Sequence, residues 1–234
     1  MKKFLAFTMA AAMTLSLAAC GGGSGSGSNT SADGSGSAAF KLGGTGPLTG
    51  DASIYGLAAQ RGAQIAVDEI NAEGGAIQFE LKYEDDVNDP EKAVNAYNAL
   101  KEWGMQISLG SVTTQPCIAT SSYNFADSIF ALTPSASSPD VISGKDNVYQ
   151  MCFSDPNQGT ASAKYISEQK LGEKVFIIWK SDDNYSTGIK DKFVAEAETL
   201  GLNVVGNATF TADSKNDFTV QLTQAKQAGA DLLF

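Results

Sequence analysis

The sequence predicts an α/β protein in which parallel sheets are covered by helices, and three observations support this prediction. Short strand-like runs alternate with helix-like runs from residue 40 to residue 234, as in proteins built on parallel sheets. Several of the strand-like runs lead into loops rich in Gly, Ser, Thr and Pro. The chain is 43% apolar, which is enough for a sizeable core. Ligands of such folds bind at the carboxyl ends of the strands.

The first strand is predicted from Phe40 to Leu42 and is followed by a Gly/Thr/Pro loop over residues 43–50. A helix follows the loop, and Gly74-Gly75 ends it. Its apolar residues fall on one face at helical spacing: Ala58, Gly62, Ile65, Ala66 and Ile70. The opposite face carries Gln60, Arg61, Gln64 and Asp68. This pattern is typical of an amphipathic helix.

The next pair of elements has clearer end signals. Residues 77–83 alternate apolar and polar side chains, which predicts a strand. Asp89 is the expected cap of the second helix, and Pro90 suits its first turn. The buried stripe of this helix is predicted to be Ala93, Val94, Tyr97 and Leu100.

The same alternation continues to the last residue. Strands are predicted at 107–109, 129–132, 148–153, 174–179, 203–205 and 231–234. Helices are predicted from Pro116, over 156–169, over 186–200 and over 218–228. The order of elements therefore predicts parallel sheets with helices on both faces.

The N-terminal segment resembles a bacterial lipoprotein signal. Lys2 and Lys3 precede the apolar residues 4–17, and Leu17-Ala18-Ala19-Cys20 follows with the small residues that a signal peptidase requires. The apolar run is too short to span a bilayer stably. Cys20 is the expected lipid attachment point of an extracytoplasmic, membrane-anchored protein. An ordinary signal peptide and an uncleaved anchor helix are the alternatives.

Residues 21–39 consist almost entirely of small and polar side chains, so a disordered tether is expected there. A Gly/Ser chain of this length spans roughly 25 Å. It is long enough to let a folded domain face away from the lipid surface.

Composition excludes several functions. The formal charge of −10 becomes −12 when Lys2 and Lys3 are removed, so nucleic acid is an unfavourable partner. The chain has no histidine and therefore lacks the usual general base and the commonest zinc ligand. The pairs Asp85-Asp86 and Asp182-Asp183 suit a hard cation or acid/base chemistry, or they cap helices and solvate loop tips. We favour the second interpretation and predict neither a metal nor a cofactor.

Three loops that precede helices are rich in hydroxyl groups, and they span residues 43–50, 110–116 and 134–139. Backbone N–H groups and hydroxyls at a helix start can hold a carboxylate or another anion, or the hydroxyls only cap the helix. A dinucleotide site is disfavoured, because Thr49 stands where the third glycine of the fingerprint is needed.

A series of ordered motifs carries a resemblance to one family. They are Gly46-Pro47-Leu48-Thr49-Gly50, Tyr55-Gly56, residues 66–71 with Gly74-Gly75, Asp85-Asp86, Asp89-Pro90, residues 133–137, Asp155 with Gln158-Gly159, Tyr185 and Asp217-Phe218. Together they resemble the leucine/isoleucine/valine-binding type of periplasmic solute-binding protein. The resemblance implies two doubly wound parallel-sheet lobes of the type I periplasmic-binding-protein fold. The expected boundaries are a first lobe over 40–154 and a partial second lobe over 155–234.

The same resemblance implies the site residues. Ser111 is the residue expected to hold a ligand carboxylate, with Val112 and Thr113 beside it. Ser137 matches a further hydroxyl, preceded by Ser135 and Ala136. Tyr55 and Tyr185 match aromatic walls from the two lobes, or they are ordinary packing residues. Asp155 and Gln158 lie at the crossing between lobes, where Asp155 contacts the hinge or only caps a helix.

The implied function is that of a monomeric lipoprotein that captures an amino acid, branched-chain by default, and delivers it to an ABC permease. Family members continue beyond this length, so the second lobe is expected to be truncated. A sensory ligand-binding module and an extracellular enzyme are the alternatives.

If Cys20 is lipidated, Cys117 and Cys152 remain as an even pair, which forms a disulfide or stays as two thiols.

Overall fold

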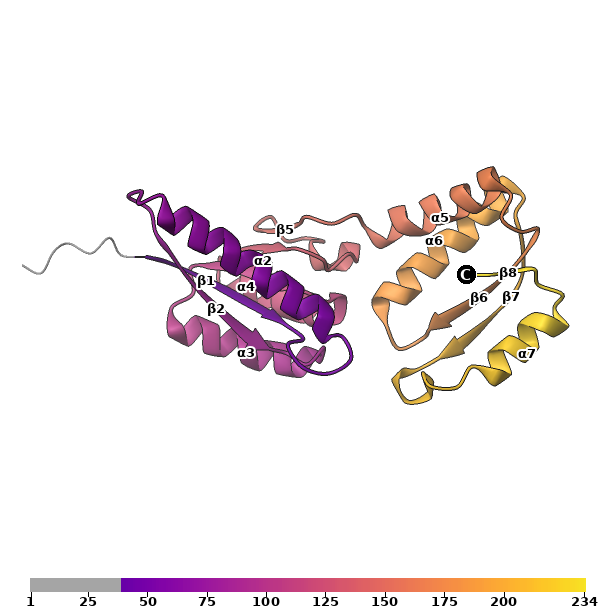
Figure 1. Cartoon of the computed structure of the whole chain (residues 1–234), viewed down its shortest axis with the longest axis horizontal. Helices are drawn as coiled ribbons and strands as arrows, with labels where there is room; N and C mark the ends of the chain where they lie inside the picture. Colours follow the sequence, from indigo (N-terminus) through magenta and orange to yellow (C-terminus); the bar gives the residue numbers. More distant parts are fainter. Residues whose placement is uncertain (1–38) are drawn as a thin grey trace, which may run out of the picture. The chain divides into compact units, whose positions relative to one another are not determined.

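The computed structural model of the protein describes residues 39–234, so the predicted signal segment with Cys20 and residues 21–38 of the predicted tether lie outside the described residues. Strands and helices alternate along the chain as predicted (Figure 1). The strands are β1 (Phe40–Gly46), β2 (Phe79–Asp85), β3 (Ile107–Ser111), β4 (Phe130–Thr133), β5 (Val148–Gln150), β6 (Lys174–Lys180), β7 (Asn203–Phe210) and β8 (Leu232–Leu233). The helices are α2 (Ser53–Ala72), α3 (Pro90–Trp103), α4 (Thr114–Ala126), α5 (Asp155–Gln169), α6 (Asn184–Leu200) and α7 (Thr219–Gln227), with short 3₁₀ turns at Pro139–Val141 and Ala212–Ser214.

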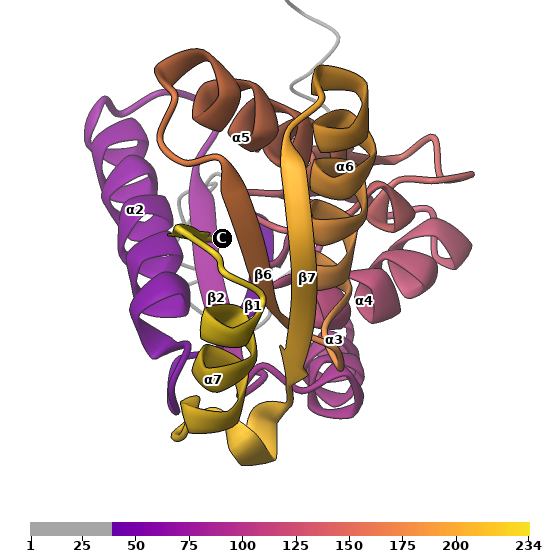
Figure 2. The ribbon, with the colours of Figure 1, turned by 90° about the vertical axis from the view of Figure 1, so that its right-hand side faces the viewer.

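The first sheet has the strand order β2-β1-β3-β4-β5, and the pairs are parallel. Helix α2 lies on one side of β1 and β2, and α3 and α4 lie on the other side (Figure 2). The direction in which successive strands are added to the sheet changes at β1, because β2 lies on one side of β1 and β3 lies on the other. Such a point leaves a crevice at the carboxyl ends of the strands.

The second sheet has the order β7-β6-β8 and is also parallel. Alternate side chains of β6 face opposite sides, as the period of a strand requires. Val175 and Ile177 pack with residues of α5 and α6. Phe176 packs on the other side with Ala225 of α7. The predicted helical cover on both faces is therefore present in this sheet too.

Strand β1 is longer than the sequence predicted, and the interpretation of residues 43–46 as loop was wrong. Because β1 lies between β2 and β3, its backbone groups pair on both sides despite the low strand propensity of glycine. A Cβ atom on Gly43 would lie 2.3 Å from Met105 Sδ, and one on Gly44 would lie 2.4 Å from the Tyr83 ring. These glycines allow large neighbouring side chains to cover the central strand.

Helix α2 does not bury the face that its apolar pattern defines. The five residues of that face, Ala58, Gly62, Ile65, Ala66 and Ile70, are all exposed. The buried residues are instead Gly56 and Val67, three turns apart. A Cβ atom on Gly56 would lie 2.1 Å from the Pro47 carbonyl oxygen, so this position must face the preceding loop. That close approach determines which side of α2 packs on the sheet.

Helix α3 follows the prediction closely. The Asp89 side chain accepts a hydrogen bond from the Lys92 backbone N–H at 2.9 Å, and Pro90 is the first helical residue. Tyr97 and Leu100 are buried as expected. In α5 the cap is Ser154, not Asp155, because the Ser154 hydroxyl accepts from the Asn157 N–H while Asp155 turns inward.

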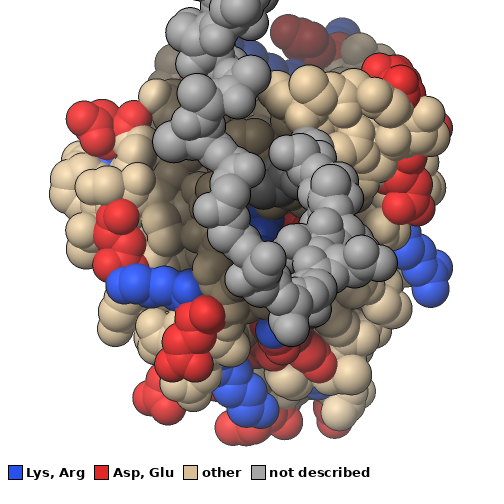
Figure 3. All heavy atoms as spheres, turned by 90° about the vertical axis from the view of Figure 1, so that its left-hand side faces the viewer, with Lys and Arg blue, Asp and Glu red and all other residues tan. Residues whose placement is uncertain are grey.

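On the face shown in Figure 3, Asp and Glu side chains are distributed around the edge of the visible area, with Lys and Arg side chains between some of them. No helix within residues 39–234 has the length and apolar character needed to cross a membrane.

Candidate ligand-binding site

A cavity of about 450 Å³ lies at the carboxyl ends of strands from both sheets. Its walls come from the loops after β1, β2, β3 and β4, from the segment before α5 and from the region between β6 and α6. The lining residues are Ala52, Tyr55, Asn88, Val112, Thr113, Thr114, Gln115, Pro134, Ser135, Ser137, Cys152, Phe153, Lys180, Asp183 and Tyr185. This is the place where the sheet topology predicts a ligand.

The N-terminus of α4 opens on this cavity without a cap. Thr113 is the N-cap residue, but its side chain makes no capping hydrogen bond, and its Oγ1 atom is buried without a partner. By contrast, α3, α5 and α6 are capped by the side chains of Asp89, Ser154 and Asp183. A helix start with free N–H groups carries partial positive charge. The site can therefore hold an anion such as a carboxylate.

Ser111 lies behind the wall of the cavity and does not line it. Its side chain is fully buried, and its hydroxyl is 2.6 Å from Thr45 Oγ1 and 3.0 Å from Thr120 Oγ1. Its carbonyl oxygen accepts a hydrogen bond from the Thr133 hydroxyl. These contacts link β1, β3, β4 and α4 behind the cavity wall.

Ser137 lines the cavity but its hydroxyl is already engaged. It donates to Asp155 Oδ1 at 2.6 Å, and the Asp155 N–H donates to the Ser137 carbonyl. Burial raises the pKa of Asp155, and nearby Asp183 raises it further, whereas the Ser137 hydrogen bond opposes this. The contacts of Asp155 therefore join the loop after β4 to the start of α5. This is the region in which the family resemblance predicts the crossing between lobes.

The two predicted aromatic walls both line the cavity, and both are accessible. Tyr55 of α2 is 63% exposed and Tyr185 of α6 is 40% exposed. The Gln158 side chain of α5 donates to the Tyr185 hydroxyl at 3.0 Å. Gln158 thus positions Tyr185. Of the remaining predicted residues, Val112 and Ser135 line the cavity, while Ala136 is fully buried behind it.

The Asp85-Asp86 pair holds loops in place. Asp85 accepts hydrogen bonds from Leu48 N–H and Val87 N–H, and from the Thr49 hydroxyl at 2.5 Å. Asp86 is fully buried and accepts from the Asn88 N–H at 2.9 Å. Within the described residues, no group of three or more Cys, Asp or Glu side chains could hold a metal ion.

Cys117 and Cys152 are free thiols in the structure. Burial raises the pKa of Cys117 to about 11. Cys152 lines the cavity, and its thiol donates to the Ala136 carbonyl at 3.4 Å. Of the two alternatives left by the sequence, the structure has the pair of separate thiols.

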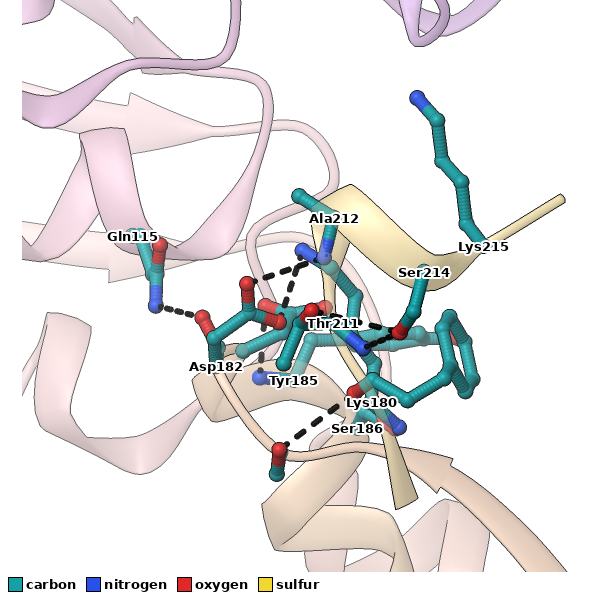
Figure 4. Close-up of polar contacts among 12 residues, drawn as sticks. Gln115, Lys180, Asp182, Tyr185, Ser186, Thr211, Ala212, Ser214 and Lys215 are labelled. Carbon is teal, nitrogen blue, oxygen red and sulfur yellow. Dashed lines mark hydrogen bonds and ion pairs between the residues drawn. The ribbon is translucent and has the colours of Figure 1, made fainter. Parts of the chain in front are cut away.

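Several lining residues were absent from the predicted site, and Figure 4 shows two of them, Gln115 and Lys180. The Gln115 side chain donates to the Asp182 carbonyl at 2.9 Å and so connects the α4 start to the loop after β6. Asp183 caps α6 through the Tyr185 N–H and also lines the cavity. The position of Asp183 shortly after a predicted strand is the sequence signal that could have identified it as a site residue. Nothing in the sequence pattern singled out Lys180.

Comparisons with known proteins agree with this fold. The model of the periplasmic binding protein family matches residues 39–234. The Leu/Ile/Val-binding protein BraC3 of Rhizobium johnstonii is 32% identical over 200 residues, covering 84% of this chain and 54% of that protein. A Pseudomonas aeruginosa leucine-, isoleucine-, valine-, threonine- and alanine-binding protein is 30% identical, with 83% and 52% covered. The chain thus spans about half the length of the curated relatives it matches.

Solved structures extend the comparison. The branched-chain amino-acid transporter substrate-binding protein LivJ of Streptococcus pneumoniae, in complex with isoleucine, is similar with a TM-score of 0.77 and 28% identity, covering 84% of this chain and 56% of that one. A solute-binding protein from R. palustris in complex with 4-hydroxybenzoate has a TM-score of 0.76 at 22% identity, covering 84% and 53%, a likeness of fold. The predicted type I periplasmic-binding-protein fold is therefore confirmed. The chain belongs to the periplasmic binding protein family.

Proposed function

We propose that the protein is an extracytoplasmic solute-binding lipoprotein that captures an amino acid and presents it to an ABC importer. The observation that carries this proposal is the uncapped start of α4, which borders a cavity lined from both sheets and next to which the Thr113 hydroxyl is buried without a partner. A ligand carboxylate placed there would accept hydrogen bonds from the free N–H groups and from Thr113. Tyr55 and Tyr185 would cover the ligand from opposite sides of the cavity.

Relatives support an amino acid as the ligand. The curated proteins that match bear names of amino-acid-binding proteins, and the S. pneumoniae structure contains isoleucine. Branched-chain amino acids are therefore the first candidates. The Asp183 carboxylate lines the cavity and would serve as a partner for the ligand ammonium group.

Calorimetry with the purified protein tests this proposal. L-leucine should bind, whereas L-leucinamide, which lacks the carboxylate, should bind at least tenfold more weakly because the α4 N-terminus then has no anion to hold. Benzoate tests whether a carboxylate without an ammonium group is sufficient, since a fold neighbour contains 4-hydroxybenzoate. Equal binding of leucine and leucinamide, or turnover of either compound, would overturn the proposal.

A pair of threonine variants on one helix locates the contact. Thr113→Val removes a hydroxyl that has no partner in the protein, so it should weaken leucine binding about tenfold and leave stability unchanged. Thr120→Val is the matched control, because the Thr120 hydroxyl donates to the Pro116 carbonyl and contacts Ser111. It should lower the free energy of unfolding by about 1 kcal/mol. If Thr113→Val binds leucine as tightly as the wild type, the carboxylate lies elsewhere.

Membrane anchoring rests on residues 1–20, whose sequence resembles a lipoprotein signal. Cells fed an alkyne-labelled fatty acid should incorporate the label into the wild-type protein and not into Cys20→Ser. Label retained by Cys20→Ser would exclude Cys20 as the lipid attachment point.

A further inference from the structure

Lys180 carries the only cationic side chain among the described residues that line the cavity. It is the last residue of β6, and its side chain is 27% exposed. The ammonium nitrogen lies 3.5 Å from Asp182 Oδ1, which is longer than an ordinary charge-assisted hydrogen bond. Figure 4 shows both side chains beside the loop that leads to α6. The ammonium group is thus weakly held at the edge of the site.

Asp182 is fixed in place by other contacts. Its Oδ2 atom accepts a hydrogen bond from the Ala212 N–H at 3.1 Å, and its carbonyl accepts one from Gln115. The carboxylate therefore balances the charge of Lys180 without saturating its hydrogen bonds, since a lysine ammonium has three donors. When a ligand displaces water from the cavity, the remaining donors need an acceptor.

Most of the residues that line the cavity carry a side-chain oxygen or nitrogen atom. The exceptions are Ala52, Val112, Pro134, Cys152 and Phe153. A branched aliphatic side chain next to Lys180 would leave the ammonium donors desolvated and unpaired. A second carboxylate on the ligand would be repelled by Asp182 and Asp183. A neutral ligand side chain with a carbonyl oxygen meets both conditions, because it accepts a hydrogen bond from the ammonium group and brings no second negative charge.

We propose that the preferred ligand is an amino acid with an amide side chain, whose carbonyl oxygen accepts a hydrogen bond from the Lys180 ammonium group. This inference rests on the proposed amino-acid-binding function and replaces its branched-chain default. The α4 start holds the carboxylate of the ligand, Asp183 faces its ammonium group, and Lys180 selects its side chain. A lost hydrogen bond to a charged group weakens binding by about tenfold to a hundredfold.

Calorimetry with L-glutamine and L-leucine on the purified protein tests this selection. The wild type should bind glutamine at least tenfold more tightly than leucine. Lys180→Met should lose this preference by weakening glutamine and leaving leucine unchanged or tighter, whereas Lys180→Arg should retain it. Lys174→Met is the matched control, because Lys174 is an exposed lysine at the opposite end of the same strand. It should bind both ligands as the wild type does.

The remaining outcomes separate this inference from the proposed function. Leucine binding as tightly as glutamine to the wild type overturns the role of Lys180 and leaves amino-acid binding intact. Equal weakening of both ligands by Lys180→Met also overturns it, because the ammonium would then serve the shared carboxylate. If neither amino acid binds, the proposed function fails and the inference fails with it.

Discussion

At the scale of single residues, Asp86 shows how the fold changes the chemistry of a side chain. The carboxyl group is fully buried beside the Asn88 N–H, and one of its oxygens, Oδ2, has no partner. Burial is the main cause that raises its pKa to about 6, and the hydrogen bond from Asn88 works against this rise. The folded state therefore holds the proton more strongly than the unfolded state does.

This raised pKa predicts a pH-dependent stability. Asp86 is protonated in both states below about pH 4, and its favourable contribution to folding is lost as the pH rises through about 6. A shift of about two pKa units corresponds to about 3 kcal/mol. The stability of the wild type relative to Asp86→Asn, measured by urea denaturation, should therefore fall by up to about 3 kcal/mol between pH 4 and pH 7.

Asp127→Asn is the control for that measurement. A hydrogen bond from Lys101 is the main cause that lowers the pKa of Asp127, so the wild-type advantage over this variant should grow as the pH rises. A difference between wild type and Asp86→Asn that is the same at pH 4 and pH 7 would contradict the assigned role of burial.

At the scale of elements, the contact between α5 and α6 depends on a glycine. A Cβ atom on Gly159 of α5 would lie 2.3 Å from the Ile189 carbonyl oxygen and 2.8 Å from the Phe193 nitrogen. The backbones of the two helices thus approach directly at this point. Phe193 and Ala163 are fully buried next to it.

Two glycine-to-alanine variants test this packing. Gly159→Ala should push the helices apart and lower the free energy of unfolding by about 1–3 kcal/mol. Gly62→Ala in α2 should instead raise it by about 0.5–1 kcal/mol, because nothing lies within 4 Å of the added Cβ atom and alanine favours the helix. Thermal denaturation of both variants measures these changes. A Gly159→Ala protein as stable as the wild type would show that the helices separate at no cost.

At the scale of the whole molecule, the segment between β5 and α5 connects the two sheets within the described residues. Met151 and Phe153 in this segment are 71% and 64% exposed. Hydrogen bonds hold both ends of this segment, because the Met151 N–H donates to the Thr133 carbonyl and the Asp155 N–H donates to the Ser137 carbonyl. Phe153 also lines the ligand cavity.

Limited proteolysis tests this connection. Within residues 39–234, chymotrypsin should first cut after Phe153, because the segment is exposed and irregular. Phe153→Ser should slow that cut at least severalfold, and a bound ligand should slow it in the wild type. Mass spectrometry of the fragments identifies the site. A first cut inside α2, despite its exposed apolar face, would contradict this view of the connection.

Sequence patterns by themselves determined the alternation of strands and helices, the cap of α3 by Asp89 and the α/β class of the fold. These follow from local rules, because capping groups and strand periods act over a few residues. Tertiary structure alone decided which face of α2 packs, that Ser111 lies behind the cavity, and that Lys180 and Gln115 line it. Each depends on backbones or side chains distant in the sequence that approach to within a few ångströms, and no local pattern records such contacts.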